Sequence, residues 1–372
     1  VLFLIAAPYI LYPLLLWLRS LFFVDAPRSA DVTPDVDLVI CAHNEERVIA
    51  ERLENALALD YPPEHLTIWV ASDGSSDNTV AIAQGFDPDR VRCLDLPRDG
   101  KAAALNTCVA AGKAEVVAFS DANSLWRQDA LRNLTRSFAD SRVGGVAGDQ
   151  RYADDATGAL GERSYWSFDR LLKCWQSRSG SVISATGAIY AVRRELFQPA
   201  PPDATDDFMV STGVIAQGKR LVFEQEAVAF ESPAGDTGEY RRKIRILTRG
   251  LRAVYYRREL LRPSRSGFYS VQLLLHKLWR RLTWIPMLLL LPAPLYAAEG
   301  GLPLLVAAAV IGLVGLGGLG LLRPSLRRFK LVEVAAHVLM VNAACAIATR
   351  NALSGRRVSH WSPTGTSAGA AP

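Results

Sequence analysis

The stretch that decides the fold is Val36-Asp-Leu-Val-Ile-Cys-Ala-His-Asn-Glu-Glu46. Its first part, Val36–Ala42, is a short apolar run, and polar side chains follow it at once. A short, nearly continuous apolar run is typical of a strand that is buried on both faces of a sheet. We therefore expect a buried strand whose carboxyl end carries polar side chains.

The same pattern recurs outward along the chain. Short apolar runs alternate with segments that have helical spacing, and this alternation predicts a parallel sheet with helices on both faces. In such sheets the ligand lies beyond the carboxyl ends of the strands. The predicted strands are Val36–Ala42, Leu66–Ser72, Val91–Leu94 and Val116–Ser120, and the predicted helices are Glu45–Leu59, Asp77–Gln84 and Lys101–Ala111.

Polar clusters stand at three of these strand ends. Any one of them fits an ordinary loop, in which Ser76 or Asp77 caps a helix or Asn123 forms an Asx turn. Three clusters at neighbouring strand ends would instead converge on one crevice. None of the three contains Lys or Arg, so the grouped carboxylates predict a bound cation or a hydroxyl-rich ligand. The clusters are His43–Glu46, Ser72–Thr79 and Ser120–Ser124.

Composition divides the chain into a globular part and membrane segments. The chain has 372 residues, of which 50% are hydrophobic, and this is too apolar for one ordinary soluble domain. The net charge is +5, and Lys and Arg gather beside the apolar runs, which favours a phospholipid membrane as partner and argues against nucleic acid. The five cysteines form no CxxC pair, which favours free thiols in a reducing compartment.

Apolar regions at both ends predict membrane association. Residues 1–18 carry no charge and predict an N-terminal transmembrane helix; a signal-peptide core is the alternative, but no basic segment precedes it. Residues 282–349 predict a C-terminal transmembrane region of two to three helices. Its last part, 332–349, contains polar residues and either spans the membrane, is re-entrant or lies in the interface. Residues 268–281 predict an interfacial amphipathic helix, or a helix that packs on the globular part.

Loop charges indicate how the chain is oriented. The link Glu299–Gly301 has no basic residue, whereas the loop Arg323–Lys330 is strongly basic. Basic loops remain on the cytoplasmic side of a membrane. We therefore expect the globular part on the cytoplasmic side of a bacterial inner (plasma) membrane, in a multi-pass protein. Residues 350–372 are expected to form a basic and then flexible tail.

Five motifs together resemble glycosyltransferase family 2, which has the GT-A fold. The resemblance covers Val36–Arg249. For residues 31–250 it implies an α/β fold, a Rossmann-like mixed sheet with helices on both faces, and inverting transfer from a nucleotide diphosphate sugar. The motifs are Cys41-Ala-His-Asn-Glu45, Ala71-Ser-Asp-Gly-Ser-Ser-Asp-Asn-Thr79, Gly100-Lys-Ala-Ala-Ala-Leu-Asn106, Ser120-Asp-Ala-Asn123 and Ala204-Thr-Asp-Asp207.

The resemblance implies a donor site with a divalent metal. Mg²⁺ or Mn²⁺ held by Asp121 would neutralise the charge that builds on the leaving diphosphate. Asn123 stands where the family has a second carboxylate, and its carbonyl oxygen can coordinate the metal or contact the ribose instead. The other implied donor-binding residues are His43, Asn44, Glu45, Lys101 and Asp73, of which Asp73 would contact a uracil-type base.

The resemblance also implies a catalytic base and an acceptor side. A carboxylate must take the proton of the acceptor hydroxyl. Asp207 is the implied base and Asp206 the alternative, although the two acids could merely begin a helix at Phe208–Gln217. Gly187 and Tyr190 lie in the segment that resembles the acceptor side of the family; a tight strand turn is the other interpretation.

Processive members of the family carry QxxRW after the base. Here Arg242 and Arg245 keep the spacing, but Arg stands for Gln and Ile246 for Trp. On one helix face these arginines would clamp the diphosphate of the donor, or else bind lipid headgroups. Because the Trp is a stacking platform for the acceptor sugar, no processivity is predicted.

The sequence therefore predicts transfer of a sugar from a nucleotide-sugar donor, with a UDP-sugar favoured, to a glycan or lipid-linked acceptor in exopolysaccharide or cell-envelope glycan synthesis. Export or polymerisation partners fit this interpretation. One alternative is a non-processive lipid glycosyltransferase. A membrane-bound nucleotidyltransferase is another, but the first loop lacks the Gly-rich, basic character that it needs. The third is a catalytically inactive scaffold of a polysaccharide export assembly.

Overall fold

The computed structural model describes residues 1–152, 160–231, 239–290, 292 and 301–356. The chain folds as two units. Residues 299 and 300 of the predicted link and 357–372 of the predicted tail lie outside the described residues. Within the described residues, unit 1 comprises 1–15, 239–254 and 271–356, and unit 2 comprises 16–231 and 255–270.

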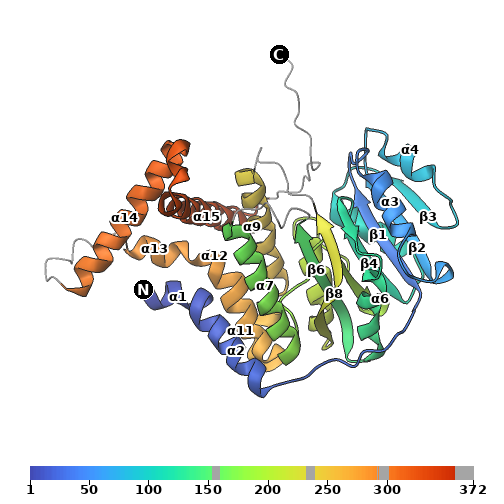
Figure 1. The fold of residues 1–372 in the computed structure, drawn as a ribbon, viewed down its shortest axis with the longest axis horizontal. Coiled ribbons are helices and arrows are strands. Elements are labelled where there is room, and N and C mark those ends of the chain that lie inside the picture. Colours follow the sequence, from blue (N-terminus) through green and yellow to red (C-terminus); the bar gives the residue numbers. More distant parts are fainter. Residues whose placement is uncertain (153–159, 232–238, 291, 293–300, 357–372) are drawn as a thin grey trace, which may run out of the picture. The chain divides into compact units, whose positions relative to one another are not determined.

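Unit 2 is built on one mixed sheet (Figure 1). Strand β1 (Val36–Ala42) is buried along its whole length and pairs in parallel with β2 (Leu66–Asp73) and β4 (Val116–Asp121). Antiparallel pairing begins where β4 meets β7 (Tyr190–Arg193). The strand order is β3-β2-β1-β4-β7-β6-β8-β5, in which β3 is Val91–Leu96, β5 Ser124–Trp126, β6 Val143–Tyr152 and β8 Arg220–Glu231.

The predicted α/β class with a mixed sheet is confirmed. The four predicted strands are β1 to β4, and their ends differ from the prediction by at most two residues. The purely parallel sheet expected from strand–helix alternation holds only for this half. The reason is that β5 and β7 enter the second half antiparallel to their neighbours.

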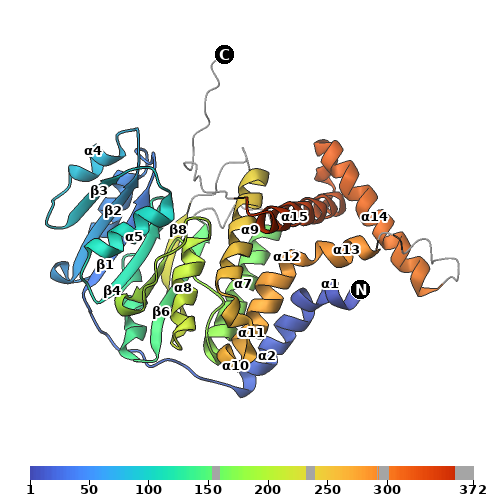
Figure 2. The ribbon, with the colours of Figure 1, turned by 180° about the vertical axis from the view of Figure 1, so that it is seen from behind.

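Helices cover both faces of the sheet. Helices α3 (Ile49–Leu57) and α6 (Ala130–Thr135) lie in front of the sheet in Figure 1. Figure 2 shows the opposite side, where α5 (Lys101–Ala111) and α8 (Asp206–Ala216) lie in front of the sheet. The core joins Leu38 and Ile40 of β1 to Ile49 and Leu53 of α3. This core fixes the strands whose carboxyl ends carry the polar clusters.

Two predicted helices begin later than expected. Helix α3 starts at Ile49 and α4 (Thr79–Gln84) starts at Thr79, because the polar residues before them form loops. Helix α5 has the predicted bounds. The loop before α3 therefore contains the first polar cluster, and the loop before α4 contains residues 74–78 of the second.

Three helices of the described chain are long and apolar enough to cross a membrane: Leu2–Phe22, Leu305–Leu322 and Lys330–Leu353. The predicted segment 332–349 lies within one continuous helix, α15 (Lys330–Leu353). In unit 1, α14 (Leu302–Leu322) packs closely on α15, since a Cβ atom at Gly320 would lie 2.8 Å from Val332 Cγ1. Small residues allow such close approach between membrane helices. Spanning itself remains a prediction.

Two predicted segments precede α14: residues 268–281 and the start of the C-terminal region at residue 282. Residues 268–281 are helical, in α11 (Phe268–Gln272), a π-helical stretch Leu273–Trp279 and α12 (Arg280–Leu282). Their place in the membrane interface remains a prediction. The start of the predicted C-terminal region is helical in α13 (Trp284–Leu290), and residues 291 and 293–298 lie outside the described residues.

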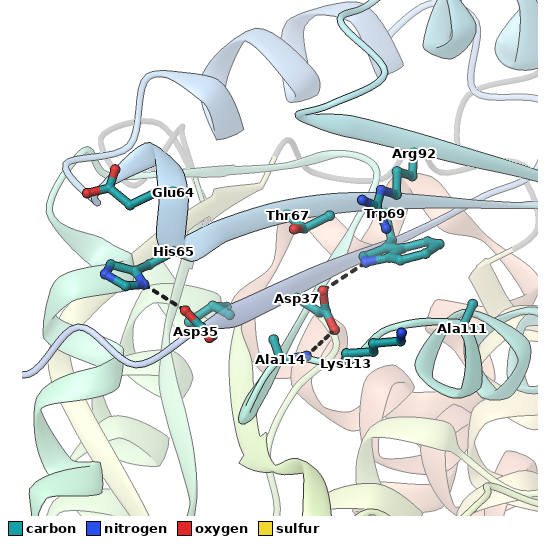
Figure 3. A pocket seen from close by; sticks show the side chains of 11 residues that line it. Asp35, Asp37, Glu64, His65, Thr67, Trp69, Arg92, Ala111, Lys113 and Ala114 are labelled. Carbon is teal, nitrogen blue, oxygen red and sulfur yellow. Dashed lines mark hydrogen bonds and ion pairs between the residues drawn. The ribbon is translucent and has the colours of Figure 1, made fainter.

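A buried charge network closes the amino-terminal edge of the sheet (Figure 3). Asp37 Oδ1 accepts a hydrogen bond from Trp69 Nε1 at 2.9 Å, and Oδ2 accepts one from Ala114 N at 3.0 Å. The same carboxylate pairs with Arg194, and its side chain is 5% exposed. A pocket of about 380 Å³ lies beside it, at the edge opposite the predicted site.

We predict that Asp37→Ala lowers the free energy of unfolding by about 3–5 kcal/mol, because it leaves Arg194 uncompensated and two N–H groups without their acceptor. Asp35→Ala is the matched control: Asp35 pairs with His65 at 2.6 Å and is exposed, so its loss costs less than about 1 kcal/mol. Thermal unfolding of the purified variants measures both effects. Equal stability of the two variants would contradict the network's role.

Candidate active site

The loops after β1 and β2 are joined to each other by hydrogen bonds. Ser76 N donates to Asn44 Oδ1 at 2.8 Å, and Glu45 N donates to Thr79 Oγ1 at 2.8 Å. Asn44 has a φ of 54°, a left-handed conformation that Asn adopts more readily than most residues. The predicted donor residues Asn44 and Glu45 therefore lie in loops whose shape is set by their own hydrogen bonds.

His43 and Asp73 connect these loops to the start of α5. His43 Nδ1 donates to the Asp73 carbonyl oxygen at 2.7 Å, and both residues are buried. Asp73 Oδ1 accepts a hydrogen bond from Gly100 N at 2.8 Å. Gly100 has a φ of 96°, which only glycine adopts without strain. Asp73 thus positions the first turn of α5, where Lys101 lies.

Lys101 is the centre of the site. Its ammonium group pairs with Asp121 at the end of β4 and lies 3.2 Å from Asp206 Oδ2 at the start of α8. The side chains of Lys101 and Asp206 are 15% and 13% exposed, and that of Asp121 is 31% exposed. Three of the predicted site residues, distant in sequence, are therefore brought together in unit 2.

The carboxylates keep Lys101 charged. Burial by itself lowers the pKa of Lys101, but the negative charges of Asp121 and Asp206 outweigh burial and hold the pKa well above its usual value. This finding corrects the interpretation that the strand-end carboxylates have no basic neighbour. The ammonium group belongs to Lys101 of α5, whereas the acids belong to other segments. The residues at the strand ends alone therefore do not reveal it.

Gly187 leaves space for the Asp121 carboxylate. A Cβ atom at Gly187 would lie 2.7 Å from Asp121 Oδ2, closer than any side chain tolerates. Tyr190, the other predicted acceptor residue, is 1% exposed and stacks on Phe119 with ring centroids 4.6 Å apart. Burial, helped by the charges of Asp206 and Asp207, raises the pKa of Tyr190. Gly187 thus borders the cluster, whereas the Tyr190 ring belongs to the core.

Asp207 lies in the first turn of α8, next to Asp206. Its Oδ1 accepts a hydrogen bond from Phe208 N at 2.7 Å, and negative charge is favoured at a helix N-terminus. Both acids do begin a helix, as the simpler interpretation holds, but Asp206 also pairs with Lys101. The two carboxylates therefore have different surroundings.

Oxygen atoms suited to a hard cation lie at the end of β4. Asp121 is the last residue of β4, and Asn123 is half-buried in the turn that leads to β5. Among the described residues no group of three or more His, Cys, Asp or Glu side chains is arranged to hold a metal. A divalent cation bound by Asp121 and Asn123 would need further oxygen ligands from a substrate or from water.

The predicted diphosphate clamp lies on α9 (Glu239–Tyr256). Arg242 and Arg245 belong to unit 1, whereas the Lys101 cluster belongs to unit 2. Burial lowers the pKa of Arg245, and the charges of Arg249 and Arg242 add to this. Arg242 and Arg245 thus lie three residues apart in one helix, as predicted, and the clamp remains a prediction.

Glu231 is a further residue at this site that the sequence reasoning missed. It ends β8, and its carboxyl accepts hydrogen bonds from Ser124 Oγ and Gln150 Nε2, each at 2.5 Å. Burial, and then the charge of Asp121, raises the pKa of Glu231 to about 7. The apolar run Ala227–Phe230, which ends in this acid, repeats the pattern seen at β1 and could have identified it.

Comparison with known proteins gives consistent matches. Residues 37–199 match the profile described as Glycosyl transferase family 2. The beta-monoglucosyldiacylglycerol synthase of Synechocystis sp. is 30% identical over 128 residues, which are 33% of this chain and 27% of that protein. The probable glycosyltransferase YdaM of Bacillus subtilis is 28% identical over 44% of this chain and 42% of its own length. The chain thus matches less than half the length of either relative.

One solved structure matches nearly the whole chain. It is a mannosyltransferase from Pyrobaculum calidifontis in complex with GDP-Man and Mn²⁺, with a TM-score of 0.71. The match covers 95% of this chain and 98% of that one at 23% identity. At this identity the likeness shows a common fold.

We predict that Glu231 makes stability fall as pH rises. Because its folded pKa of about 7 lies above the ordinary value of 4.5, the unfolded chain ionises first, and stability is lost between these two values. Glu231→Gln cannot ionise, so its melting temperature relative to the wild type should be higher at about pH 8 than at about pH 5. Glu51→Gln, at an exposed position, is the control. A difference that does not change with pH would exclude this role.

Proposed function

We propose that the chain, in which residues 37–199 match the profile of Glycosyl transferase family 2, is an inverting glycosyltransferase that uses a nucleotide diphosphate sugar. The observation that carries the proposal is the cluster of Lys101, Asp121 and Asp206, with Asp207 next to it in the chain. The cluster lies beyond the carboxyl ends of parallel strands, where sheets of this kind bind ligands.

Asp207 is the base in this proposal. Asp206 pairs with Lys101, and the family resemblance assigns the role of base to Asp207. In the reaction the acceptor oxygen bonds to the anomeric carbon of the sugar, and the bond from that carbon to the diphosphate breaks. Asp207 takes the proton of the acceptor hydroxyl as this happens. Attack from the face opposite the diphosphate inverts the anomeric centre.

We propose Asp121 and Asn123 as ligands of Mg²⁺ or Mn²⁺. Both residues present oxygen atoms, the donor type that these ions prefer, and the lack of a side chain at Gly187 lets the Asp121 carboxylate lie close to its backbone. The cation would neutralise charge on the leaving diphosphate. The structure of the mannosyltransferase in complex with GDP-Man and Mn²⁺ supports a divalent cation as cofactor.

The proposed donor is a UDP-sugar, from the resemblance of the Ala71–Thr79 motif. A lipid-linked acceptor is supported by the name of the Synechocystis relative, a beta-monoglucosyldiacylglycerol synthase, and by the three long apolar helices. Ile246, which is 43% exposed, stands where processive members of the family have the Trp of QxxRW. Because Ile offers no aromatic ring on which an acceptor sugar could stack, we favour a single transfer over polymerisation. Exopolysaccharide or envelope glycan synthesis is the proposed setting.

We propose that the catalytic domain works on the cytoplasmic face of a bacterial inner membrane. The three apolar helices are consistent with membrane association. The loop Arg323–Lys330, which joins α14 to α15, is strongly basic. This charge favours the cytoplasmic side of the membrane for the loop. A nucleotide-sugar donor, which is made in the cytoplasm, requires the same side.

The test is nucleotide diphosphate release from a panel of UDP- and GDP-sugars by the full chain in lipid nanodiscs, with Mn²⁺ and lipid acceptors. We predict that Asp207→Asn lowers kcat at least ~100-fold, because the acceptor proton has no base. Asp95→Asn, on the exposed side of edge strand β3, is the matched control and should retain activity. Release from no donor, or release that Asp207→Asn leaves unchanged, would overturn the proposal.

A further inference from the structure

The Lys101 ammonium group occupies the position where a cation bound to Asp121 would carry its charge. It contacts Asp121 and lies 3.2 Å from Asp206 Oδ2. It is a cationic group that pairs with both carboxylates. A mostly buried carboxylate pair is strongly unfavourable without a counter-charge. Lys101 therefore allows Asp121 and Asp206 to approach each other in the absence of a metal ion.

The surroundings of Asp121 leave little choice of partner. On one side Oδ1 bonds to Lys101, and on the other the Gly187 backbone lies so close to Oδ2 that a Cβ atom there would clash. A divalent cation that binds Asp121 would meet the ammonium charge at short range, and like charges at that distance repel strongly. The ammonium group and the metal thus compete for the same carboxylate.

The side chain of Lys101 is able to move. Its backbone is held at the start of α5, because Gly100 N donates to Asp73 Oδ1. The four-carbon side chain of Lys101 is flexible. Its ammonium group is therefore able to leave Asp121 and remain paired with Asp206. This movement keeps Asp206 paired while Asp121 changes partner.

We propose that Lys101 is an internal counter-cation, which holds Asp121 in the donor-free enzyme and gives it up to the divalent cation only when a nucleotide diphosphate arrives. This inference rests on the proposed function. The negative charge of the diphosphate offsets the repulsion between the Lys101 ammonium group and the divalent cation. Metal and nucleotide therefore bind cooperatively. Lys101 acts as a positioning residue that makes metal binding depend on the donor.

The experiment measures the affinity of the full chain in detergent for Mn²⁺ alone, for UDP in EDTA, and for UDP in Mn²⁺. In the wild type UDP should tighten Mn²⁺ binding at least ~10-fold. In Lys101→Met, Mn²⁺ alone should bind at least ~10-fold more tightly, and the coupling with UDP should shrink towards none. Lys113→Met, at an exposed position, is the control and should match the wild type.

A second readout guards against misfolding. The melting temperature of Lys101→Met without metal should fall by about 5 °C or more and recover on addition of Mn²⁺. Lys101→Arg keeps the charge and should retain weak binding of Mn²⁺ alone, so it tests the inference even if the Met variant is unstable.

Unchanged or weaker binding of Mn²⁺ alone by Lys101→Met would overturn the inference, as would tight binding of Mn²⁺ alone by Lys101→Arg. Loss of UDP binding in EDTA with no change for Mn²⁺ would show that Lys101 serves only the diphosphate. These binding measurements need no turnover. If the wild type releases UDP from a donor but Lys101→Met does not bind Mn²⁺ alone more tightly, this inference is wrong and the proposed function stands. If Lys101→Met does bind Mn²⁺ alone more tightly but the wild type turns over no donor, the proposed function is wrong and this inference stands.

Discussion

The ion pairs of Lys101 with Asp121 and Asp206 are the interaction on which the rest of the site depends. Lys101 begins α5, Asp121 ends β4 and Asp206 begins α8, so one ammonium group joins three segments that are distant in sequence. Each of these mostly buried charges would be costly without the others. Asp73, which fixes the start of α5, and Gly187, which leaves space for Asp121, serve the same cluster.

The first half of the sheet could be predicted from the sequence and the second half could not. Val36–Ala42 and Lys101–Ala111 were predicted with their observed bounds, because each is a continuous segment of one pattern. Strand β6 is different, since it is rich in glycine. A Cβ atom at Gly148 would lie 2.6 Å from Ala227 O, so close packing on β8 replaces the apolar side chains that make a strand visible in a sequence.

The site was predicted in its parts but not in its electrostatics. Strand-end polarity identified Asp121, and family resemblance supplied Lys101 and Asp206. Their pairing could not be predicted, because it depends on where the start of α5 and the start of α8 meet the end of β4. Glu231 was missed because β8 was not predicted, and its nearness to Asp121 arises from the pairing of β5 with β8.

In the proposed function this cluster binds the diphosphate of a nucleotide-sugar through a divalent cation on Asp121. The decisive measurement is equilibrium binding of UDP to the wild type and to Asp121→Asn, each in Mn²⁺ and in EDTA. We expect Asp121→Asn to weaken UDP binding at least ~10-fold in Mn²⁺ and to have little effect in EDTA, because the substitution removes a charged metal ligand. Equal affinity of the two proteins for UDP in Mn²⁺ would show that Asp121 holds no cation for the diphosphate.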